Sequence, residues 1–222
     1  MLQDPDVGEL LTKNGSNLAS VLARMKNLEP EIYDRVTDYL RQVAPEVTNV
    51  EPTTLGPKET LSFRQEVKGA AHPWRFFAAN MSDGTLRALG VLVALMQLNR
   101  SGDRVRLIGI EEPETALHPA ATGVLMDSIR EAAESTQVML TTHSTTLLDE
   151  YQEDTDSLFV VVNDGGITSL GPVGPSTQQT VREHLYTAGE LLRQDHLTVD
   201  RRAVERQREL RFDFQPDDEG AH

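Results

Sequence analysis

The sequence predicts an α/β protein built around a parallel sheet, and three stretches between residues 104 and 144 lead to that class. Residues 105–110 (VRLIGI) form an almost continuous apolar run, which is typical of a buried parallel strand. Residues 120–133 follow with the length and apolar spacing of a helix, and residues 138–140 form a second apolar run. A crossover of this length makes the two strands parallel and favours their being neighbours.

Polar side chains follow both predicted strands. Glu111 and Glu112 come directly after the first strand, and His143 follows the second within the sequence TTHS. Because parallel neighbours end at the same edge of a sheet, these three side chains are expected to emerge together. In open parallel sheets that edge binds ligands. The spacing therefore predicts where a site lies and leaves its chemistry open.

The residues before this unit predict helices and then short strands. Residues 17–25 and 31–43 have the apolar spacing of two helices, which Pro30 and Pro45 delimit. From residue 47 to residue 79 the period shortens to about two, and Thr, Val and Phe become frequent, which favours short antiparallel strands. This amino-terminal segment carries no chemistry by itself.

A strongly apolar helix is predicted over residues 86–98, directly after the sequence NMSDGT. Ser82 is a good N-cap, Asp83 suits the positive end of the helix dipole, and Gly84 lets another molecule approach the backbone. A helix start of this kind can hold a phosphate. An ordinary capped core helix explains the same residues, so this segment alone does not decide between the two.

The carboxyl-terminal third predicts a hairpin, short helices and a tail. Residues 157–163 and 167–170 predict two strands joined by a Gly-Gly turn, with short helices near 181–185 and 189–193. The tail is the one basic segment, with five Arg and two Glu in RRAVERQRELR. It favours a solvated or docking helix, with contact to nucleic acid or an acidic partner as the sharper alternative. The last residues, PDDEGAH, are expected to be disordered.

The composition of the chain excludes several classes of protein. The 222 residues suffice for one large domain or two small ones, and a formal net charge of -14 opposes a broad nucleic-acid-binding face. The absence of cysteine excludes disulfides, thiolate metal sites and a cysteine nucleophile. The longest apolar run, residues 88–98, is well short of the ~20 residues that span a bilayer, and the amino terminus does not resemble a secretory leader. We therefore expect a cytoplasmic protein without membrane contact.

Three motifs now stand in a fixed order: MSDGT before a helix, LIGIEEPETALHP at a strand end, and TTHS at the next strand end. Together they resemble the second half of the ATPase head of ABC transporters, SMC proteins and the RecF and OLD-type ATPases. The nearest resemblance is to bacterial AAA-type ATPases whose Walker B motif reads EEPE. It covers roughly residues 15–193. It implies a P-loop NTPase-like fold of the ABC ATPase type, with a parallel sheet flanked by helices, incomplete at the amino-terminal side, and a small helical and antiparallel-β insertion.

The resemblance also implies roles for single residues. The signature loop of this family contacts the γ-phosphate of a nucleotide held by the opposite protomer, and its counterpart here consists of Ser82, Asp83, Gly84 and Thr85. Glu111 matches the Walker B acid that holds Mg²⁺ through water, where most relatives have Asp. Glu112 matches the catalytic glutamate, His143 the switch histidine, and residues 116–119 the D-loop.

These roles agree with the chemistry of phosphoryl transfer. Mg²⁺ takes oxygen ligands and keeps several waters, so one carboxylate at a strand tip suffices. The reaction needs charge neutralised and water aligned, which suits a second carboxylate and an imidazole. However, GxxxxGK[ST] occurs nowhere in the sequence, so the phosphate-cradling loop is missing from these residues. We therefore expect half of a nucleotide site, from a chain that is truncated, split from a partner gene or degenerate.

Three functions compete. The first is an ATPase head that uses ATP and Mg²⁺ only with a Walker A-bearing amino-terminal segment or partner chain, as a nucleotide-dependent dimer, with nucleic acid left open as a contact of the complete assembly. The second is a non-catalytic interaction module derived from such an ATPase. The third is a metal-dependent phosphoesterase or nuclease, disfavoured because no second acidic cluster accompanies Glu111, Glu112, Glu114 and His118. Intact Glu112 and His143 favour the first.

The organisation expected from these motifs has three parts. Residues 1–80 form a helical and short-strand segment, residues 81–195 the ATPase core, and residues 196–222 the basic helix and tail. In this ATPase class the missing phosphate-loop strand lies inside the sheet. The strands over 138–141 and 158–162 are therefore expected either to pair directly or to receive a strand from another chain.

Overall fold

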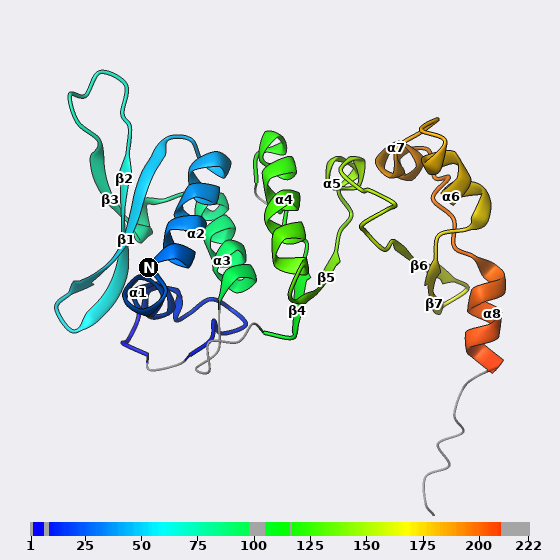
Figure 1. Ribbon diagram of the computed structural model, residues 1–222, viewed down its shortest axis with the longest axis horizontal. Coiled ribbons are helices and arrows are strands. Elements are labelled where there is room, and N and C mark those ends of the chain that lie inside the picture. The colour runs from blue at the N-terminus through cyan, green and yellow to red at the C-terminus, as the bar shows by residue number, and fades with distance from the viewer. Residues whose placement is uncertain (1, 7–8, 98–104, 116, 210–222) are drawn as a thin grey trace, which may run out of the picture. The chain divides into compact units, whose positions relative to one another are not determined.

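The computed structural model describes residues 2–6, 9–97, 105–115 and 117–209. The chain divides into two compact units, Met1–Glu150 and Tyr151–His222 (Figure 1). The three parts predicted from the sequence follow motif content rather than contacts, and their boundaries stay a prediction.

Two helices and an antiparallel sheet begin the first unit. α1 (Leu18–Leu28) and α2 (Pro30–Val43) are the two predicted helices, and α2 starts on a proline because first-turn N–H groups lack partners within the helix anyway. The strands β1 (Val47–Leu55), β2 (Lys58–Gln65) and β3 (Trp74–Phe77) pair antiparallel in the order β1-β2-β3. This confirms the predicted short antiparallel strands.

α3 (Asp83–Met96) is the central helix of the first unit and follows the single turn η1 (Ala78–Asn80). Most of its side chains are buried, and it packs against α1, α2 and α4 (Figure 1). Ser82 caps it as predicted, by accepting the N–H of Thr85 at 3.1 Å. The helix starts three residues before the predicted position 86, because the capped segment already forms its first turn.

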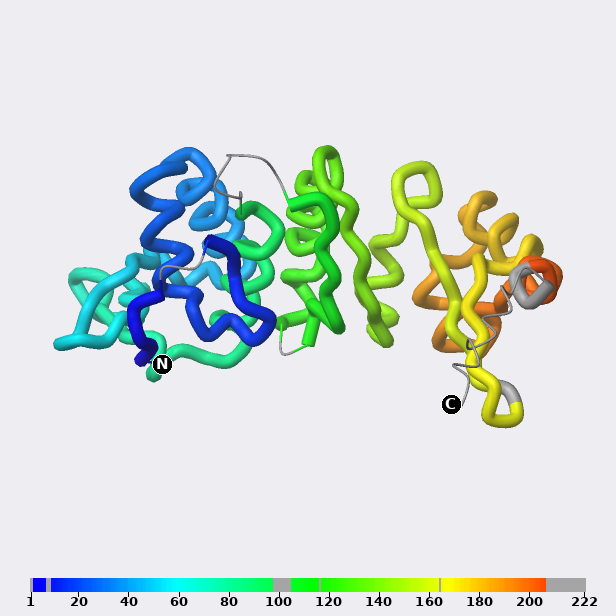
Figure 2. The backbone as a smooth tube through the Cα atoms, turned by 90° about the horizontal axis from the view of Figure 1, so that it is seen from below, coloured from blue at the N-terminus to red at the C-terminus, as the bar shows by residue number. Residues whose placement is uncertain are grey.

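The predicted strand–helix–strand unit is present. β4 (Leu107–Glu111) leads through η2 (Pro119–Ala121) and α4 (Thr122–Ala133) into β5 (Gln137–Thr141), and α5 (Thr145–Asp149) follows. The strands pair in parallel with Glu111 opposite Thr141, so the prediction of parallel neighbours is confirmed. α4 lies alongside β5 in both Figure 1 and Figure 2.

One face of this two-stranded sheet is covered and the other is open. Ile108 of β4 is buried and Leu140 of β5 packs against the core, whereas Leu107 and Met139 are 55% and 60% exposed. Parallel strands normally have both faces covered. Among the described strands, β5 pairs with β4 alone. The described sheet is thus open on one face and at one edge of β5.

The described part of the second unit, residues 151–209, consists of a hairpin and three helices. Its elements are β6 (Phe159–Asp164), β7 (Ile167–Pro172), α6 (Pro175–Arg182), α7 (Ala188–Arg193) and α8 (Arg201–Glu209). The two strands pair antiparallel, which confirms the predicted hairpin. α8 packs on β7 (Figure 2). The buried side chain of Val204 lies against Gly171.

Some predictions for the second unit need correction. The helix expected near 181–185 is α6, which starts at Pro175 and ends at Arg182, before His184 adopts a positive φ of +54°. The predicted disorder over 216–222 concerns residues outside the described part. Within the described residues, no helix has both the length and the apolar character needed to cross a bilayer.

Candidate functional site

The carboxyl ends of β4 and β5 bring together the predicted site residues of the two strands. Glu111 lies opposite Thr141, and the N–H of Glu112 donates to the carbonyl oxygen of Thr141 at 2.9 Å. His143 follows two residues later. The backbone thus carries Glu111, Glu112 and His143 at one edge of the sheet, as their spacing predicts.

The side chains of Glu111 and His143 are exposed at this edge. Neither forms a hydrogen bond or ion pair with the described residues, so both are available to a ligand. The exposure of His143 also excludes the alternative of a histidine satisfied within the core. Their roles toward a ligand stay a prediction.

Glu112 is held in an unusual backbone conformation. Its φ is +44°, in the left-handed region that costs a non-glycine residue about 1–3 kcal/mol. The turn to Thr115 holds it there, because the Thr115 N–H donates to the Glu112 carbonyl oxygen at 3.0 Å. The Thr115 hydroxyl donates to Glu112 Oε2 at 3.1 Å. Backbone and carboxylate of Glu112 are therefore positioned by the same residue.

An arginine from α3 reaches the same strand end, which the sequence analysis did not predict. Nη2 of Arg87 donates to the carbonyl oxygens of Glu111 and Glu112 at 3.0 and 2.9 Å. Apart from Asp83 in the first turn, Arg87 is the one charged residue in α3. A lone cation in an otherwise apolar helix is the signal that could have pointed to a specific partner.

Glu114 and Thr142 connect the loops that follow the two strands. The Thr142 hydroxyl donates to Glu114 Oε1 and accepts the N–H of Ser144 at 2.9 Å. Ser144 in turn caps α5 by accepting the N–H of Leu147 at 3.2 Å. Thr142 thus fixes the backbone on both sides of His143. Its role could not be read from local sequence, because Glu114 and Thr142 lie 28 residues apart.

The predicted phosphate-contact residues lie at the start of α3. Ser82 and Asp83 are exposed, whereas Thr85 is buried with its hydroxyl 2.8 Å from Ser82 Oγ. Gly84 lies between Asp83 and Thr85 in the first helical turn. Arg87, less than one turn beyond Gly84 in the same helix, links this segment to the Glu111–Glu112 strand end.

The carboxylates of the described residues do not gather into a metal site made of protein groups alone. In the described ranges, no group of three or more His, Asp or Glu side chains is placed to hold a metal ion. Glu112 is bound by Thr115, Glu114 by Thr142, and His118 accepts the N–H of Ala120 at 3.2 Å. The exposed carboxylate of Glu111 does fit an ion held through water, for which one side chain suffices.

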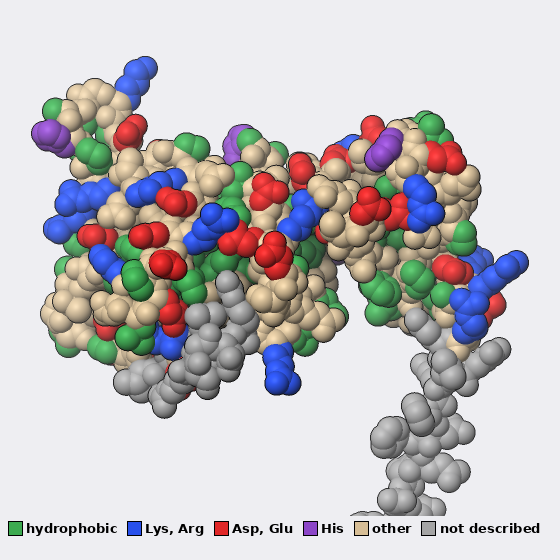
Figure 3. Space-filling model, in the orientation of Figure 1, with side chains coloured by type: hydrophobic (Ala, Val, Ile, Leu, Met, Phe, Trp, Pro, Cys, Tyr) green, Lys and Arg blue, Asp and Glu red, His purple; other side chains and the backbone are tan. Residues whose placement is uncertain are grey.

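Charges of both signs are interspersed on the surface. On the face drawn in Figure 3, Lys and Arg side chains alternate with Asp and Glu rather than gathering into one broad patch. The predicted basic helix is α8, where Arg201 and Arg202 are exposed. Its predicted last residues, 210–211, lie outside the described part.

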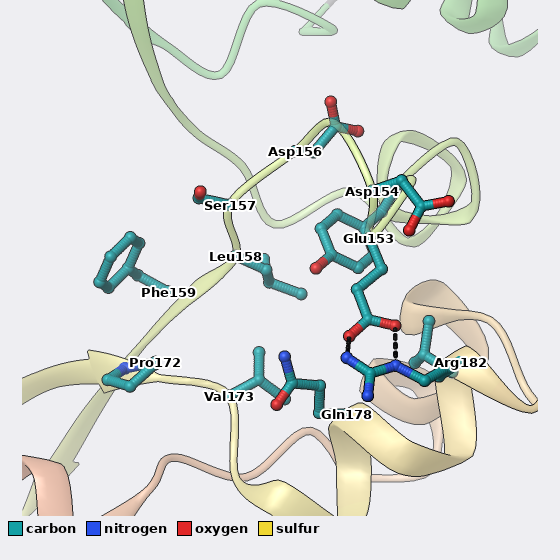
Figure 4. Close-up of a pocket in the computed structure, with 12 residues that line it drawn as sticks. Glu153, Asp154, Asp156, Ser157, Leu158, Phe159, Pro172, Val173, Gln178 and Arg182 are labelled. Carbon is teal, nitrogen blue, oxygen red and sulfur yellow. Dashed lines mark hydrogen bonds and ion pairs between the residues drawn. The ribbon is translucent and has the colours of Figure 1, made fainter.

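A cavity of about 360 Å³ lies within the second unit, lined by residues between Tyr151 and Arg182. Figure 4 shows Arg182 facing the carboxylate of Glu153, while Asp154 and Asp156 point away from this pair. The closer of the two contacts between Arg182 and Glu153 is 2.5 Å long. The hydrogen bond from Arg182 lowers the pKa of Glu153. The cavity contains none of the predicted site residues.

Comparison with known proteins decides the family. Residues 7–149 match the family described as "AAA domain, putative AbiEii toxin, Type IV TA system". The chain belongs to this family. The match includes both the NMSDGT segment and the β4–β5 edge, so the predicted site of this AAA-domain chain lies inside the family region.

The AAA-domain chain also resembles a plant protein, "ABC transporter A family member 12" of Arabidopsis thaliana. The two are 33% identical over 94 residues, which cover 42% of this chain and 9% of that protein. The chain therefore spans less than a tenth of that relative's length.

Solved SMC heads share the fold. An SMC ATPase solved in work on ATP-driven dimerization and DNA-stimulated activation gives a TM-score of 0.50 at 13% identity, over 72% of this chain and 94% of that one. An Smc head bound to the C-terminal domain of ScpA, from Pyrococcus furiosus, gives 0.51 at 11%, over 78% and 44%. An Smc head with coiled coil and joint, from Pyrococcus yayanosii, gives 0.53 at 12%, over 72% and 30%. The AAA-domain chain is thus an ABC/SMC-like ATPase domain with a P-loop NTPase-like fold, as predicted.

Proposed function

We propose that this chain forms the carboxyl-terminal part of an ATP-hydrolysing head, which works once a Walker A-bearing segment or partner chain completes the nucleotide site. The observation that carries the proposal is the common edge of β4 and β5, which holds Glu111, Glu112 and His143 together. ATPase-type function is what the family and the SMC-like fold support in general.

Each residue at this edge has a proposed task. The exposed carboxylate of Glu111 holds Mg²⁺ through water, and the ion neutralises phosphate charge when bound. The carboxylate of Glu112 orients the attacking water and accepts its proton. The imidazole of His143, with no bond to the described residues, contacts the terminal phosphate.

The start of α3 is proposed to serve a second protomer. Ser82, Asp83 and Gly84 contact the γ-phosphate of a nucleotide held by the opposite chain, in a nucleotide-dependent dimer. Thr85 is buried with its hydroxyl on Ser82, so it positions Ser82 rather than touching the phosphate. The uncovered first turn suits this task, because its N–H groups and positive dipole end favour anions.

The phosphate-binding loop must come from outside these residues in this proposal, since GxxxxGK[ST] occurs nowhere in the 222. The open edge of β5 and the exposed Leu107 and Met139 support a strand added at this sheet. Added strands pair with free backbone groups, and an apolar face gains by being covered. Nucleic acid would be a contact of the complete assembly.

Glu112→Gln tests the proposal in a complex with a segment or partner chain that carries GxxxxGK[ST]. The amide keeps the shape and loses the base, so we expect ATP turnover to stop while nucleotide-dependent association persists. Glu134→Gln, an exposed carboxylate at the end of α4, is the matched control. Hydrolysis that survives Glu112→Gln would remove Glu112 from the catalytic role.

Calorimetric titration of the isolated chain with Mg-ATP tests the missing loop separately. The backbone amides of that loop supply much of the phosphate affinity in such sites. The isolated chain should therefore bind ATP weakly or not at all and hydrolyse none. Micromolar affinity of the isolated 222 residues would contradict the need for a completing segment.

A further inference from the structure

Arg87 places a guanidinium between two parts of the proposed machinery. It lies on α3, two residues after Thr85, and its Nη2 bonds the carbonyl oxygens of both Glu111 and Glu112. The side chain is exposed and forms no ion pair with a carboxylate of the described residues. Its bonds go to two successive carbonyl groups instead, so its effect falls on the backbone of the strand end.

Hydrogen bonds to the backbone at the end of β4 help to hold a strained conformation. Glu112 has a φ of +44° and would gain by relaxing to an ordinary backbone conformation. Its carbonyl oxygen accepts from Arg87 at 2.9 Å and from the Thr115 N–H at 3.0 Å. A bond from a charged donor is stronger than a neutral one, so Arg87 is a main restraint on this turn.

We propose that Arg87 is a positioning residue that couples the start of α3 to the carboxylate of Glu112. A displacement of α3 moves Arg87, which either holds or releases the strained turn at Glu112. The route of the coupling is short, because Ser82 caps the same mostly buried helix that carries Arg87.

The inference rests on the proposed function and adds a regulation to it. In the proposed dimer the Ser82 loop of one chain contacts the nucleotide of its partner, whereas Glu112 of that chain serves its own nucleotide. Arg87 therefore links the occupancy of one site to the geometry of the other. Because such a coupling free energy is reciprocal, nucleotide binding at the two sites should be cooperative.

Amide hydrogen exchange of the isolated chain tests the positioning without any ATPase activity. Arg87→Met keeps the stem and removes the donors, so the amides of Glu112 and Thr115 should exchange about tenfold faster. Amides in the interior of α3 should be unchanged. Arg41→Met is the matched control, because Arg41 is an exposed arginine that bonds the carbonyl of Thr48 at 2.8 Å. Unchanged exchange at Glu112 in Arg87→Met would overturn the positioning role.

Turnover by the completed assembly tests the coupling. Arg87→Met should lower kcat about tenfold, leave the KM for ATP near its original value and bring the Hill coefficient toward one. Arg87→Lys keeps a cation and should recover part of kcat, which a merely structural role would not require. Arg41→Met should match the unmodified chain.

The outcomes separate this inference from the proposed function. If Glu112→Gln stops turnover while Arg87→Met leaves kcat and cooperativity unchanged, the coupling is wrong and the proposed function stands. If the completed assembly hydrolyses no ATP, the proposed function fails and the regulation built on it fails too. The exchange measurement then still decides whether Arg87 positions Glu112.

Discussion

The phenol of Tyr39 on α2 donates to Oε2 of Glu131 on α4 at 2.6 Å. Arg35, one turn before Tyr39, bonds both oxygens of the same carboxylate, with a closest distance of 2.6 Å. This cluster ties α2 to α4, the helix that precedes β5. It therefore contributes to the placement of the β4–β5 edge from a distance.

The environment of Tyr39 predicts that the protein loses folding stability at alkaline pH. Burial first, and the Glu131 hydrogen bond second, raise the pKa of Tyr39 to about 12 from an ordinary value of 10.0. A raised folded-state pKa contributes stability that is fully present below pH 10 and is lost as the pH rises through about 12. Tyr39→Phe should be less stable than the unmodified chain at neutral pH and should show a shallower decline over this window. Urea unfolding between pH 8 and 12 measures both slopes, and equal slopes would contradict the assignment to Tyr39.

The hydrogen bonds of Thr142 predict that removing its hydroxyl destabilises the loop around His143. Thr142→Val keeps the shape and removes the hydroxyl that bonds Glu114 and Ser144, leaving the Glu114 carboxylate without that partner. We expect a loss of about 1–3 kcal/mol in the free energy of unfolding. Thr141→Val is the control, since Thr141 is exposed on β5 and should change stability by less than about 0.5 kcal/mol. Equal effects of the two substitutions in urea unfolding would count against the Thr142 bridge.

The close packing around Gly171 predicts that a larger residue does not fit at this position of the second unit. A Cβ at Gly171 would meet the Cγ2 atoms of Val199 and Val204, each at 2.8 Å, whereas a Cβ at Gly109 would meet nothing within 4 Å. Gly171→Ala should destabilise the contact between β7 and α8 by about 1–3 kcal/mol. Proteolysis of α8 reports this contact directly. Faster cleavage is expected in Gly171→Ala, and Gly109→Ala should be cleaved like the unmodified chain.

Met139 predicts that the open sheet face contributes little to the stability of the isolated chain. Met139→Gln should change the free energy of unfolding by less than about 0.5 kcal/mol, because the side chain is 60% exposed. Met126→Gln on α4, where the side chain is 7% exposed, should cost about 2 kcal/mol or more. Calorimetric melting compares the two. A large loss in Met139→Gln would show that this face is already covered.

Local patterns in the sequence predicted much of the fold. The helices α1 and α2 follow from apolar spacing, and the parallel pairing of β4 and β5 follows from the length of the crossover. α6 begins earlier than the sequence predicts, because its sequence, PSTQQTVR, has almost no apolar stripe and its start is set by Pro175. The periodicity of apolar residues cannot predict a polar helix whose start is determined by a proline.

The residues of the candidate site also fall into two groups, those that the sequence predicts and those that it does not. Spacing places Glu111, Glu112 and His143 at one edge because the positions follow from the ends of two strands. The residues that hold them, Arg87 and Thr142, act over 24 to 28 positions in the chain. Such contacts depend on tertiary packing, which leaves no periodic signal in a single sequence.

The free edge of β5 predicts a change in amide protection when the site is completed. Among the described strands β5 pairs with β4 alone, so amides of residues 138–141 that point away from β4 lack a strand partner. In the isolated chain at low concentration these amides should exchange fast, while amides bonded to β4 are protected. Addition of the GxxxxGK[ST]-bearing segment should protect them, because an inserted strand pairs with that edge.

The control is a segment whose completing strand carries a proline at the pairing position, since proline removes a donor from the ladder. Protection of residues 138–141 that appears only with the unmodified segment supports strand addition. Full protection in the dilute isolated chain would instead mean that this chain closes the edge by itself, through pairing of 138–141 with 158–162. That result would favour a binding module over a dormant ATPase, because closure fills the edge where the phosphate loop is proposed to enter.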